Sequence, residues 1–163
     1  MYIDDTVAAI ATPPGIGGVS IIRVSGKNAF SLVDSIFQSA GSLPLKERPN
    51  KTVQYGHIIN PKTGDILDEV ILLLMQGPHS YTAEDVVEIQ CHGGIVSTRA
   101  ILTLLTSLGI RLAEPGEFTK RAFMNGRIDL TQAEAIIDII EAKTEDSLSL
   151  AVKQLDGTVS SLD

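Results

Sequence analysis

The sequence predicts an α+β fold, in which a mixed β-sheet packs against helices. Short runs rich in Val and Ile are interspersed with segments of helical periodicity, without the strict strand–helix alternation that a doubly wound sheet requires. Hydrophobic residues make up 44% and charged residues 20% of the 163 residues, which is typical of a domain that buries its own core. The last part of the chain carries apolar residues at helical spacing. We therefore expect an α+β domain followed by a long helix.

The first third of the chain contains the patterns of two strands and one helix. Residues 6–11 and 18–25 are Val- and Ile-rich runs on either side of a turn rich in proline and glycine. A helix is expected to begin near Ser25 or Gly26, because apolar residues then recur at helical spacing on one face: Ala29, Phe30, Val33, Ile36 and Phe37. Residues 40–51 combine two prolines with mixed charge and are expected to form a loop.

The middle of the chain predicts a hairpin, a further strand and a helix. Residues 52–59 and 66–75 have the pattern of two strands joined by the turn-forming segment 60–65. Residues 86–91 predict another strand, which leads into a helix that ends before Gly109.

The last third predicts a short strand at residues 110–113, a short helix at residues 116–126 and then a long helix. Residues 131–134, Thr-Gln-Ala-Glu, form a capping box at the beginning of the long helix. Its apolar stripe continues almost to the last residue: Ile137, Ile140, Thr144, Leu148, Ala151, Leu155, Val159 and Leu162. Because such a stripe needs other helices to cover it, we expect a fragment of a longer protein, with one domain in residues 1–118 and the beginning of a helical domain in residues 119–163.

Charge and cysteine content limit the classes of function. The net charge is −7 and the 13 Lys and Arg residues are scattered, whereas a protein that grips nucleic acid through its phosphates usually carries a basic patch. Tight nucleic-acid binding by this chain alone is therefore not expected. The single cysteine allows no internal disulfide, the N-terminus lacks the features of a signal peptide, and the longest apolar run, residues 70–75, is too short to span a membrane. We expect a cytoplasmic protein.

Three charged residues are candidates for a ligand site. Arg23 and Glu88 each interrupt a strand of apolar residues, and an unpaired charge is costly to bury. Two interpretations are about equally open: an internal ion pair, or a pocket in which Glu88 accepts hydrogen bonds from a heterocycle and Arg23 holds an anionic or carbonyl group. Arg127 is expected to project from the turn after the short helix; the alternative is a surface arginine paired with Asp129.

Other motifs favour structural roles. The Gly-rich loop at residues 13–18 lacks the Lys-Ser/Thr of a phosphate-binding loop and precedes a strand, so a plain turn is expected. Residues 77–85 are interpreted as a solvated loop, because the 3 histidines of the chain show no metal-ligand spacing. Cys91 is expected to be a small buried residue. Gly93 and Gly94 either serve close packing or lie where backbone N–H groups receive an anion.

Three long stretches of the sequence resemble one protein family. They are DTVAAIATPPGIGGVSIIRVSG at residues 5–26, GPHSYTAEDVVEIQCHGG at residues 77–94 and AEPGEFTKRAFMNGRIDLTQAEAIIDIIEAKT at residues 113–144. In this order they are similar to the N-terminal part of the MnmE (TrmE) family of tRNA-modifying GTPases. The similarity covers nearly the whole chain and is weak only at residues 38–65.

The resemblance implies a fold, a ligand and partners. It implies an α+β domain like the tetrahydrofolate-binding domain of glycine-cleavage T-proteins, which dimerises and binds a reduced folate, 5-formyltetrahydrofolate or 5,10-methylenetetrahydrofolate, as a one-carbon donor. The positions that match the family's folate contacts are Arg23, Glu88 and Arg127. The implied partners are a second copy of the chain, the FAD-dependent protein MnmG, and tRNA, whose wobble uridine is modified.

The family's GTPase domain, which carries its GTP, Mg²⁺ and K⁺ sites, and its C-terminal cysteine motif have no counterpart in these 163 residues. We therefore expect this chain not to hydrolyse GTP, and to act as a folate-binding and dimerisation module. The alternative is a dimerisation scaffold without a ligand, in which Arg23 and Glu88 form a structural ion pair. A nucleotide-phosphate module built on the loop at Gly15 is disfavoured, because the Lys-Ser/Thr of such loops is missing.

Overall fold

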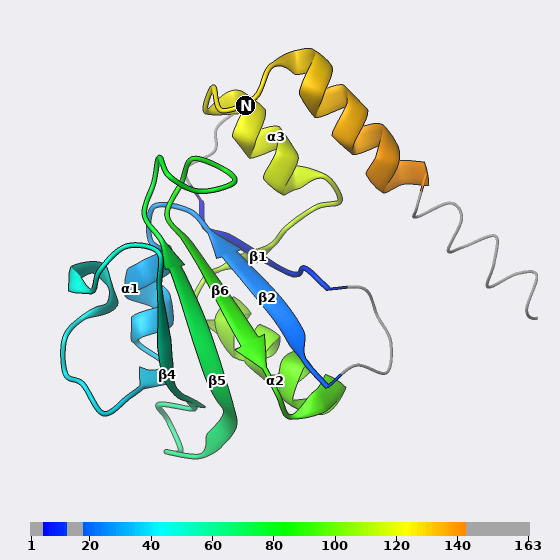
Figure 1. Ribbon diagram of the computed structural model, residues 1–163. Coiled ribbons are helices and arrows are strands. Elements are labelled where there is room, and N and C mark those ends of the chain that lie inside the picture. The colour runs from blue at the N-terminus through cyan, green and yellow to red at the C-terminus, as the bar shows by residue number, and fades with distance from the viewer. Residues whose placement is uncertain (1–4, 13–17, 143–163) are drawn as a thin grey trace, which may run out of the picture.

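The computed structural model describes residues 5–12 and 18–142, and it has the predicted α+β fold (Figure 1). Within the described residues, seven strands form one mixed sheet: β1 (Val7–Ile10), β2 (Ser20–Ser25), β3 (Phe37–Gln38), β4 (Thr52–Ile59), β5 (Ile66–Met75), β6 (Val86–Cys91) and β7 (Arg111–Leu112). Their order across the sheet is β3-β4-β5-β6-β2-β1-β7. Neighbouring strands are antiparallel except for β1 and β7, which are parallel.

Two helices cover one face of the sheet and leave the other face open. Helices α1 (Ala29–Asp34) and α2 (Gly94–Ser107) lie behind the central strands in Figure 1. The core lies between these helices and the sheet, and every second residue of the central strands is buried in it: Ile22, Val24, Leu72, Leu74, Val87 and Ile89. This is the period-two pattern of a sheet with one covered face. We call the opposite face the open face.

A further pair of helical segments lies beyond one end of the sheet. Helix α3 (Glu117–Met124) and the helical residues 130–142 lie at the top of Figure 1, above the loop that joins β5 to β6. A short 3₁₀ turn, η1 (Leu45–Glu47), interrupts the loop predicted at residues 40–51. The end of the sheet near α3 is therefore where chain segments distant in sequence converge.

The strands of the central hairpin and their neighbour have the predicted bounds. Residues 52–59, 66–75 and 86–91 form β4, β5 and β6. Helix α2 ends before Gly109, whose φ of 94° is the left-handed conformation that terminates many helices. The structure therefore confirms these predictions. They succeed because the apolar patterns and the turn residues indicate the same boundaries.

The first helix is shorter than predicted. Helix α1 has only 6 residues. Two residues expected on its apolar face lie beyond its end: Ile36 in a turn and Phe37 in β3. Phe37 pairs with Ile58 of β4, and its ring lies so close to Gly56 that an added Cβ would stand 2.6 Å from ring atoms. Strand pairing at long range therefore overrides the helical periodicity of this segment.

The capping box of the C-terminal helix lies two residues earlier than predicted. The backbone N–H of Gln132 donates to Oδ1 of Asp129 at 2.7 Å, and the backbone N–H of Asp129 donates to Oε1 of Gln132 at 3.0 Å. Thr131, the predicted cap, already lies within the helix. Aspartate caps a helix as well as threonine does, and Asp129 precedes Thr131 in the chain.

Two predicted features lie outside the described residues. They are residues 13–17 of the Gly-rich loop and the part of the long helix that follows residue 142. In the part of the chain that the structure describes, no helix has the length and apolar character needed to cross a membrane.

Candidate ligand-binding site

Arg23 and Glu88 lie opposite each other on the open face of the sheet. They are register partners on the neighbouring antiparallel strands β2 and β6. The Nε of Arg23 donates a hydrogen bond to Oε2 of Glu88 at 2.9 Å, and the two side chains are 25% and 17% exposed. The two charges therefore form an ion pair, which solvent can still reach.

Two aromatic rings and a second arginine surround this ion pair. The guanidinium carbon of Arg23 lies 5.5 Å from the ring centre of Tyr81 and 5.2 Å from that of Phe118. The guanidinium carbon of Arg127 lies 5.1 Å from the same Tyr81 ring. These distances are those of cation–π contacts. Tyr81 thus joins Arg127 to the pair of Arg23 and Glu88, and we call these five residues the site cluster.

Arg127 is exposed, and the partner considered for it from the sequence is engaged elsewhere. The carboxylate of Asp129 caps the C-terminal helix. Among the described residues, no carboxylate forms an ion pair with Arg127. Since Glu88 balances Arg23, Arg127 gives the site cluster a net positive charge, although the chain as a whole carries −7. The site cluster can therefore attract an anion locally.

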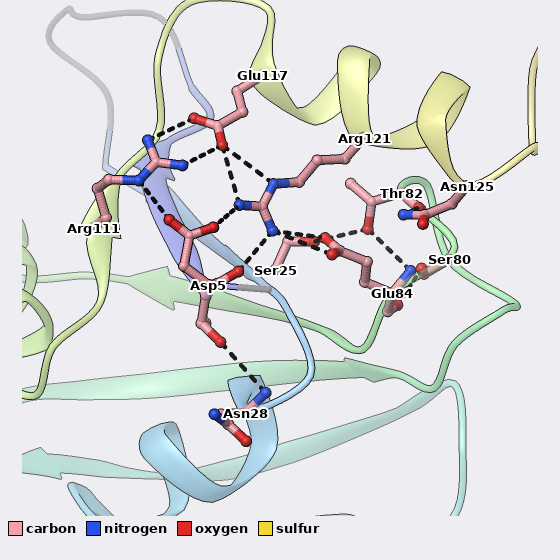
Figure 2. Close-up of polar contacts among 11 residues, drawn as sticks. Asp5, Ser25, Asn28, Ser80, Thr82, Glu84, Arg111, Glu117, Arg121 and Asn125 are labelled. Carbon is pink, nitrogen blue, oxygen red and sulfur yellow. Dashed lines mark hydrogen bonds and ion pairs between the residues drawn. The ribbon is translucent and has the colours of Figure 1, made fainter. Parts of the chain in front are cut away.

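The loop at residues 77–85 joins β5 to β6. Pro78 and His79 are exposed, as expected of a solvated loop, but the second half of the loop is anchored to the rest of the domain. Thr82 is fully buried, and the side chain of Glu84 is only 12% exposed. The hydroxyl of Ser25, on β2, lies 2.7 Å from Oγ1 of Thr82 and donates to Oε1 of Glu84 at 2.8 Å (Figure 2). The prediction was wrong for this second half, because its polar residues have partners in distant parts of the chain. We call residues 77–85 the site loop.

A fully buried arginine on α3 binds the site loop. Nη1 of Arg121 donates to both carboxylate oxygens of Glu84, at 3.2 and 3.1 Å. Nη2 of Arg121 donates to Oδ1 of Asp5 at 2.5 Å and to Oε2 of Glu117 at 3.1 Å (Figure 2). Arg111 pairs with the same Asp5 and Glu117. We call these five residues, Asp5, Glu84, Arg111, Glu117 and Arg121, the Arg121 cluster.

The Arg121 cluster was missed by the sequence analysis. One signal was available, because Glu117 and Arg121 are four residues apart on one helix. The other contacts of Arg121, to Glu84 and Asp5, span 37 and 116 positions. No local pattern in the sequence predicts contacts over such separations.

The ion pairs of the Arg121 cluster shift pKa values. The hydrogen bond from Arg111 lowers the pKa of Asp5, burial opposes this effect, and Arg121 lowers the pKa further. Burial raises the pKa of Glu117, but hydrogen bonds from Arg111, the backbone N–H of Glu114 and Arg121 outweigh it and hold the pKa below its usual value. The bonds to Glu117 and Asp5 raise the pKa of Arg111. Asp5, Glu117 and Arg111 are therefore charged at neutral pH.

The other motifs considered from the sequence, at Gly93 and Gly94 and at Cys91, have structural roles. The backbone N–H groups of His92 and Gly93 donate to Oδ2 of Asp68 at 2.8 and 3.0 Å, so the protein's own carboxylate occupies the anion position before α2. Cys91 is 1% exposed, as expected. Burial, together with the charge of Asp68, raises the pKa of its thiol to about 12. Within the described residues, no cluster of three His, Cys, Asp or Glu side chains has the arrangement of a metal site.

The fold and the site cluster define a class of protein: an α+β domain that presents paired charges and aromatic rings on the open face of its sheet. Residues 6–127 match the family described as GTP-binding protein TrmE N-terminus. The chain belongs to this family. The matched residues include the whole site cluster and all of the Arg121 cluster except Asp5.

Several curated relatives carry the name tRNA modification GTPase MnmE. The relative from Alkaliphilus oremlandii is 55% identical over 160 residues, which cover 98% of this chain and 35% of the relative. The relative from Levilactobacillus brevis is 56% identical over 158 residues, with 97% and 33% covered. The relative from Carboxydothermus hydrogenoformans is 58% identical over 155 residues, with 95% and 34% covered. The chain thus spans about a third of the length of these relatives.

Proposed function

We propose that this chain is the folate-binding module of a tRNA-modifying GTPase, and that its ligand is a reduced folate such as 5-formyltetrahydrofolate or 5,10-methylenetetrahydrofolate. The observation that carries the proposal is the site cluster, in which the Tyr81 ring contacts both Arg127 and Arg23, and Arg23 is paired with Glu88. The relatives named tRNA modification GTPase support the wider role.

Glu88 fits the pterin end of a folate. Its Oε2 accepts the hydrogen bond from Arg23, whereas its Oε1 takes part in no hydrogen bond among the described residues. A pterin presents neighbouring N–H donors, and a carboxylate accepts such a pair well. Arg23 bonds to Glu88 through Nε, so its two Nη groups can donate to a carbonyl oxygen of the ligand.

The remaining residues of the site cluster suit the rest of a folate. The rings of Tyr81 and Phe118 are partly exposed and offer flat surfaces against which an aromatic ring can stack. The exposed guanidinium of Arg127 suits the glutamate carboxylates of a folate. A bound folate supplies the one-carbon unit, and the residues of this chain bind and orient it.

We further propose a homodimer in which the open face contacts a second copy. Val53 and Tyr55 on this face are 63% and 58% exposed. In the strand register, Val53 is opposite Leu73, Leu73 is opposite Glu88, and Glu88 is opposite Arg23. Val53 is therefore in the same row as the ion pair, whereas Tyr55 is in the row of Ile71 and Gln90. Exposed apolar surface of this kind favours association. A second copy on this face would lie beside the folate.

The other partners belong, by this proposal, to the longer protein. Residues 1–118 form the folate-binding domain, and residues 119–163 begin a helical domain. The FAD-dependent protein MnmG and tRNA bind the assembled protein, and GTP, Mg²⁺ and K⁺ bind outside these 163 residues. The modification takes place in the cytoplasm.

A dimerisation scaffold without a ligand is the second candidate function. The ion pair of Arg23 and Glu88 favours it, because each charge is already neutralised by the other. The cation–π contacts to Tyr81 and Phe118 also hold Arg23 without any ligand.

Isothermal titration with 5-formyltetrahydrofolate separates the two candidates. Glu88→Gln keeps the shape of the side chain and removes its charge, so we expect saturable binding by the wild-type chain and an affinity at least about 100-fold lower in the variant. Glu69→Gln, which alters another carboxylate on the open face, is the control and should bind like the wild type. Absence of wild-type binding at concentrations where the chain is dimeric would favour the scaffold.

A further inference from the structure

The proposed folate contacts do not involve the Arg121 cluster, although this cluster contains the one fully buried charge among the described residues. Arg121 is 0% exposed, and a buried guanidinium is costly unless its N–H groups have acceptors. Its Nε donates to Glu117, its Nη1 to Glu84 and the backbone oxygen of Asp5, and its Nη2 to Asp5 and Glu117. A guanidinium held from three sides fixes the positions of its partners relative to one another.

One of these partners, Glu84, holds the site loop in shape. While its carboxylate accepts from Arg121, its backbone oxygen accepts from the hydroxyl of Ser80. Its backbone N–H donates to Oγ1 of Thr82 at 3.2 Å. Ser80 and Thr82 are the two neighbours of Tyr81 in the chain. Glu84 therefore fixes the backbone on both sides of the tyrosine whose ring contacts both arginines of the site cluster.

Helix α3 holds the same tyrosine from the other side. The hydroxyl of Tyr81 lies 2.7 Å from Oγ1 of Thr119. The same helix carries Phe118, whose ring contacts Arg23. Arg121, two residues beyond Thr119, ties α3 to the site loop. The geometry of both aromatic rings in the site cluster thus depends on where Arg121 holds the loop and the helix.

We propose that Arg121 is a positioning residue of the ligand site. Through Glu84 it holds the Tyr81 ring against Arg23 and Arg127, and so sets the affinity for the ligand without contacting it. The inference rests on the proposed folate function for its affinity measurement. The position of Tyr81 can be measured without any ligand.

Glu84→Gln is the test variant, and it spares the fold more than a substitution of Arg121. It keeps an oxygen that accepts from Ser25 and removes the charge that pairs with Arg121, which retains Asp5 and Glu117. Asp5→Asn is the matched control. It also removes a carboxylate charge that pairs with the guanidinium of Arg121, but Asp5 is not part of the site loop.

Two measurements are made on the wild-type chain and on both variants, at a temperature where circular dichroism shows all three folded. The first is the fluorine NMR spectrum of the chain labelled with fluorotyrosine, in which Tyr81 is one of 3 tyrosines and is assigned with Tyr81→Phe. The second is titration with 5-formyltetrahydrofolate. We expect Glu84→Gln to move or broaden the Tyr81 resonance and to weaken binding about tenfold, and Asp5→Asn to change neither.

An unchanged affinity or an unchanged Tyr81 resonance in Glu84→Gln would overturn the inference. Equal changes in both variants would also overturn it, because they would follow the loss of a charge at Arg121 and not the attachment of the loop. If the wild-type chain binds no folate, the proposed function fails. The Tyr81 resonance alone then tests whether Arg121 positions Tyr81. A resonance that moves only in Glu84→Gln supports the positioning of Tyr81, and one that stays in place refutes it.

Discussion

Arg127 is the exposed residue of the site cluster, and its contribution to binding is expected to be electrostatic. Arg127→Met keeps an unbranched side chain near Tyr81 but removes the charge. We expect the affinity for 5-formyltetrahydrofolate to fall about tenfold and to depend less on salt, because an exposed charge pair is screened by salt. Titration at low and high salt measures both effects.

Lys120→Met is the matched control for Arg127→Met, since Lys120 is an exposed cation on α3. It should leave the affinity nearly unchanged. An equal loss in the two variants would show that net charge alone attracts the ligand, and that Arg127 has no particular place in the site.

The thiol of Cys91 gives a prediction about pH and stability. Its pKa rises from 9.0 to about 12 in the folded chain, chiefly through burial. Below about pH 8 the thiol is protonated in both states and has no effect. As the pH rises from about 9 to 12, the thiol ionises only in the unfolded chain, so the free energy of unfolding falls, by about 1.4 kcal/mol at pH 10.

Cys91→Ala removes this titration and provides the comparison. The difference in the free energy of unfolding between wild type and variant, measured by urea denaturation, should shrink by about 1.4 kcal/mol between about pH 8 and pH 10. A difference that stays constant over this range would show that the folded chain does not suppress ionisation of the thiol.

At the residue scale, the sequence indicated those residues of the site cluster that contrast with their neighbours. Arg23 and Glu88 stand out as charges within apolar strands. Tyr81 lies in a polar loop and Phe118 on a short amphipathic helix, where an aromatic residue is ordinary. The burial of Arg121 could not be predicted, because the three carboxylates that allow it come from three separate segments.

At the element scale, the edge strand β3 depends on Gly56 of β4. A Cβ at this position would meet ring atoms of Phe37 at 2.6 Å, and it would also collide with the backbone oxygen of Gln38. Because β3 cannot move away without losing its pairing, Gly56→Ala should lower the free energy of unfolding by about 2–4 kcal/mol. Thermal or urea denaturation measures the change.

Gly41→Ala is the control for Gly56→Ala. An added Cβ at Gly41 would meet only the tip of the Arg48 side chain, at 4.0 Å. We expect a change within about 0.5 kcal/mol. A Gly56→Ala variant as stable as this control would mean that β3 does not pack against β4 as described.

Elements with an unambiguous period were predicted well, and those decided by tertiary contacts were not. In β4 and β5, apolar and polar residues alternate, and a turn-forming segment separates the two runs. Only a pair of strands fits this pattern. The segment that ends in Phe37 is compatible with a helix by its spacing, but its pairing with Ile58 makes it a strand. Local sequence carries no information about that pairing.

At the scale of the whole molecule, the open face should determine association. Val53→Glu places a charge on this face, in the row of the sheet that leads from the exposed Val53 through Leu73 to the ion pair of the site cluster. If two copies meet through this face, the dissociation constant of the dimer should rise at least about tenfold, since a buried unpaired charge is costly. Analytical ultracentrifugation over a range of concentrations measures it.

Val96→Glu is the control for Val53→Glu. Val96 is 78% exposed and lies on α2, which covers the opposite face of the sheet. It should leave the dimer unchanged. A wild-type chain that stays monomeric, or a dimer that Val96→Glu disrupts and Val53→Glu does not, would contradict the proposed interface.

The α+β class could be predicted because it follows from the kinds and order of elements, which local patterns encode. The convergence of α3, the site loop and the beginning of the chain could not, because it depends on which residues meet at one end of the sheet. Asp5 and Arg121, 116 positions apart, are joined only in the folded molecule.

A crystal structure of this chain with 5-formyltetrahydrofolate tests the central claim most directly. We predict a pterin bound to the carboxylate of Glu88, beside the rings of Tyr81 and Phe118, with Arg127 toward the glutamate end. A folate bound away from the site cluster, or a site cluster that keeps its ion pair without ligand at saturating folate, would contradict the account.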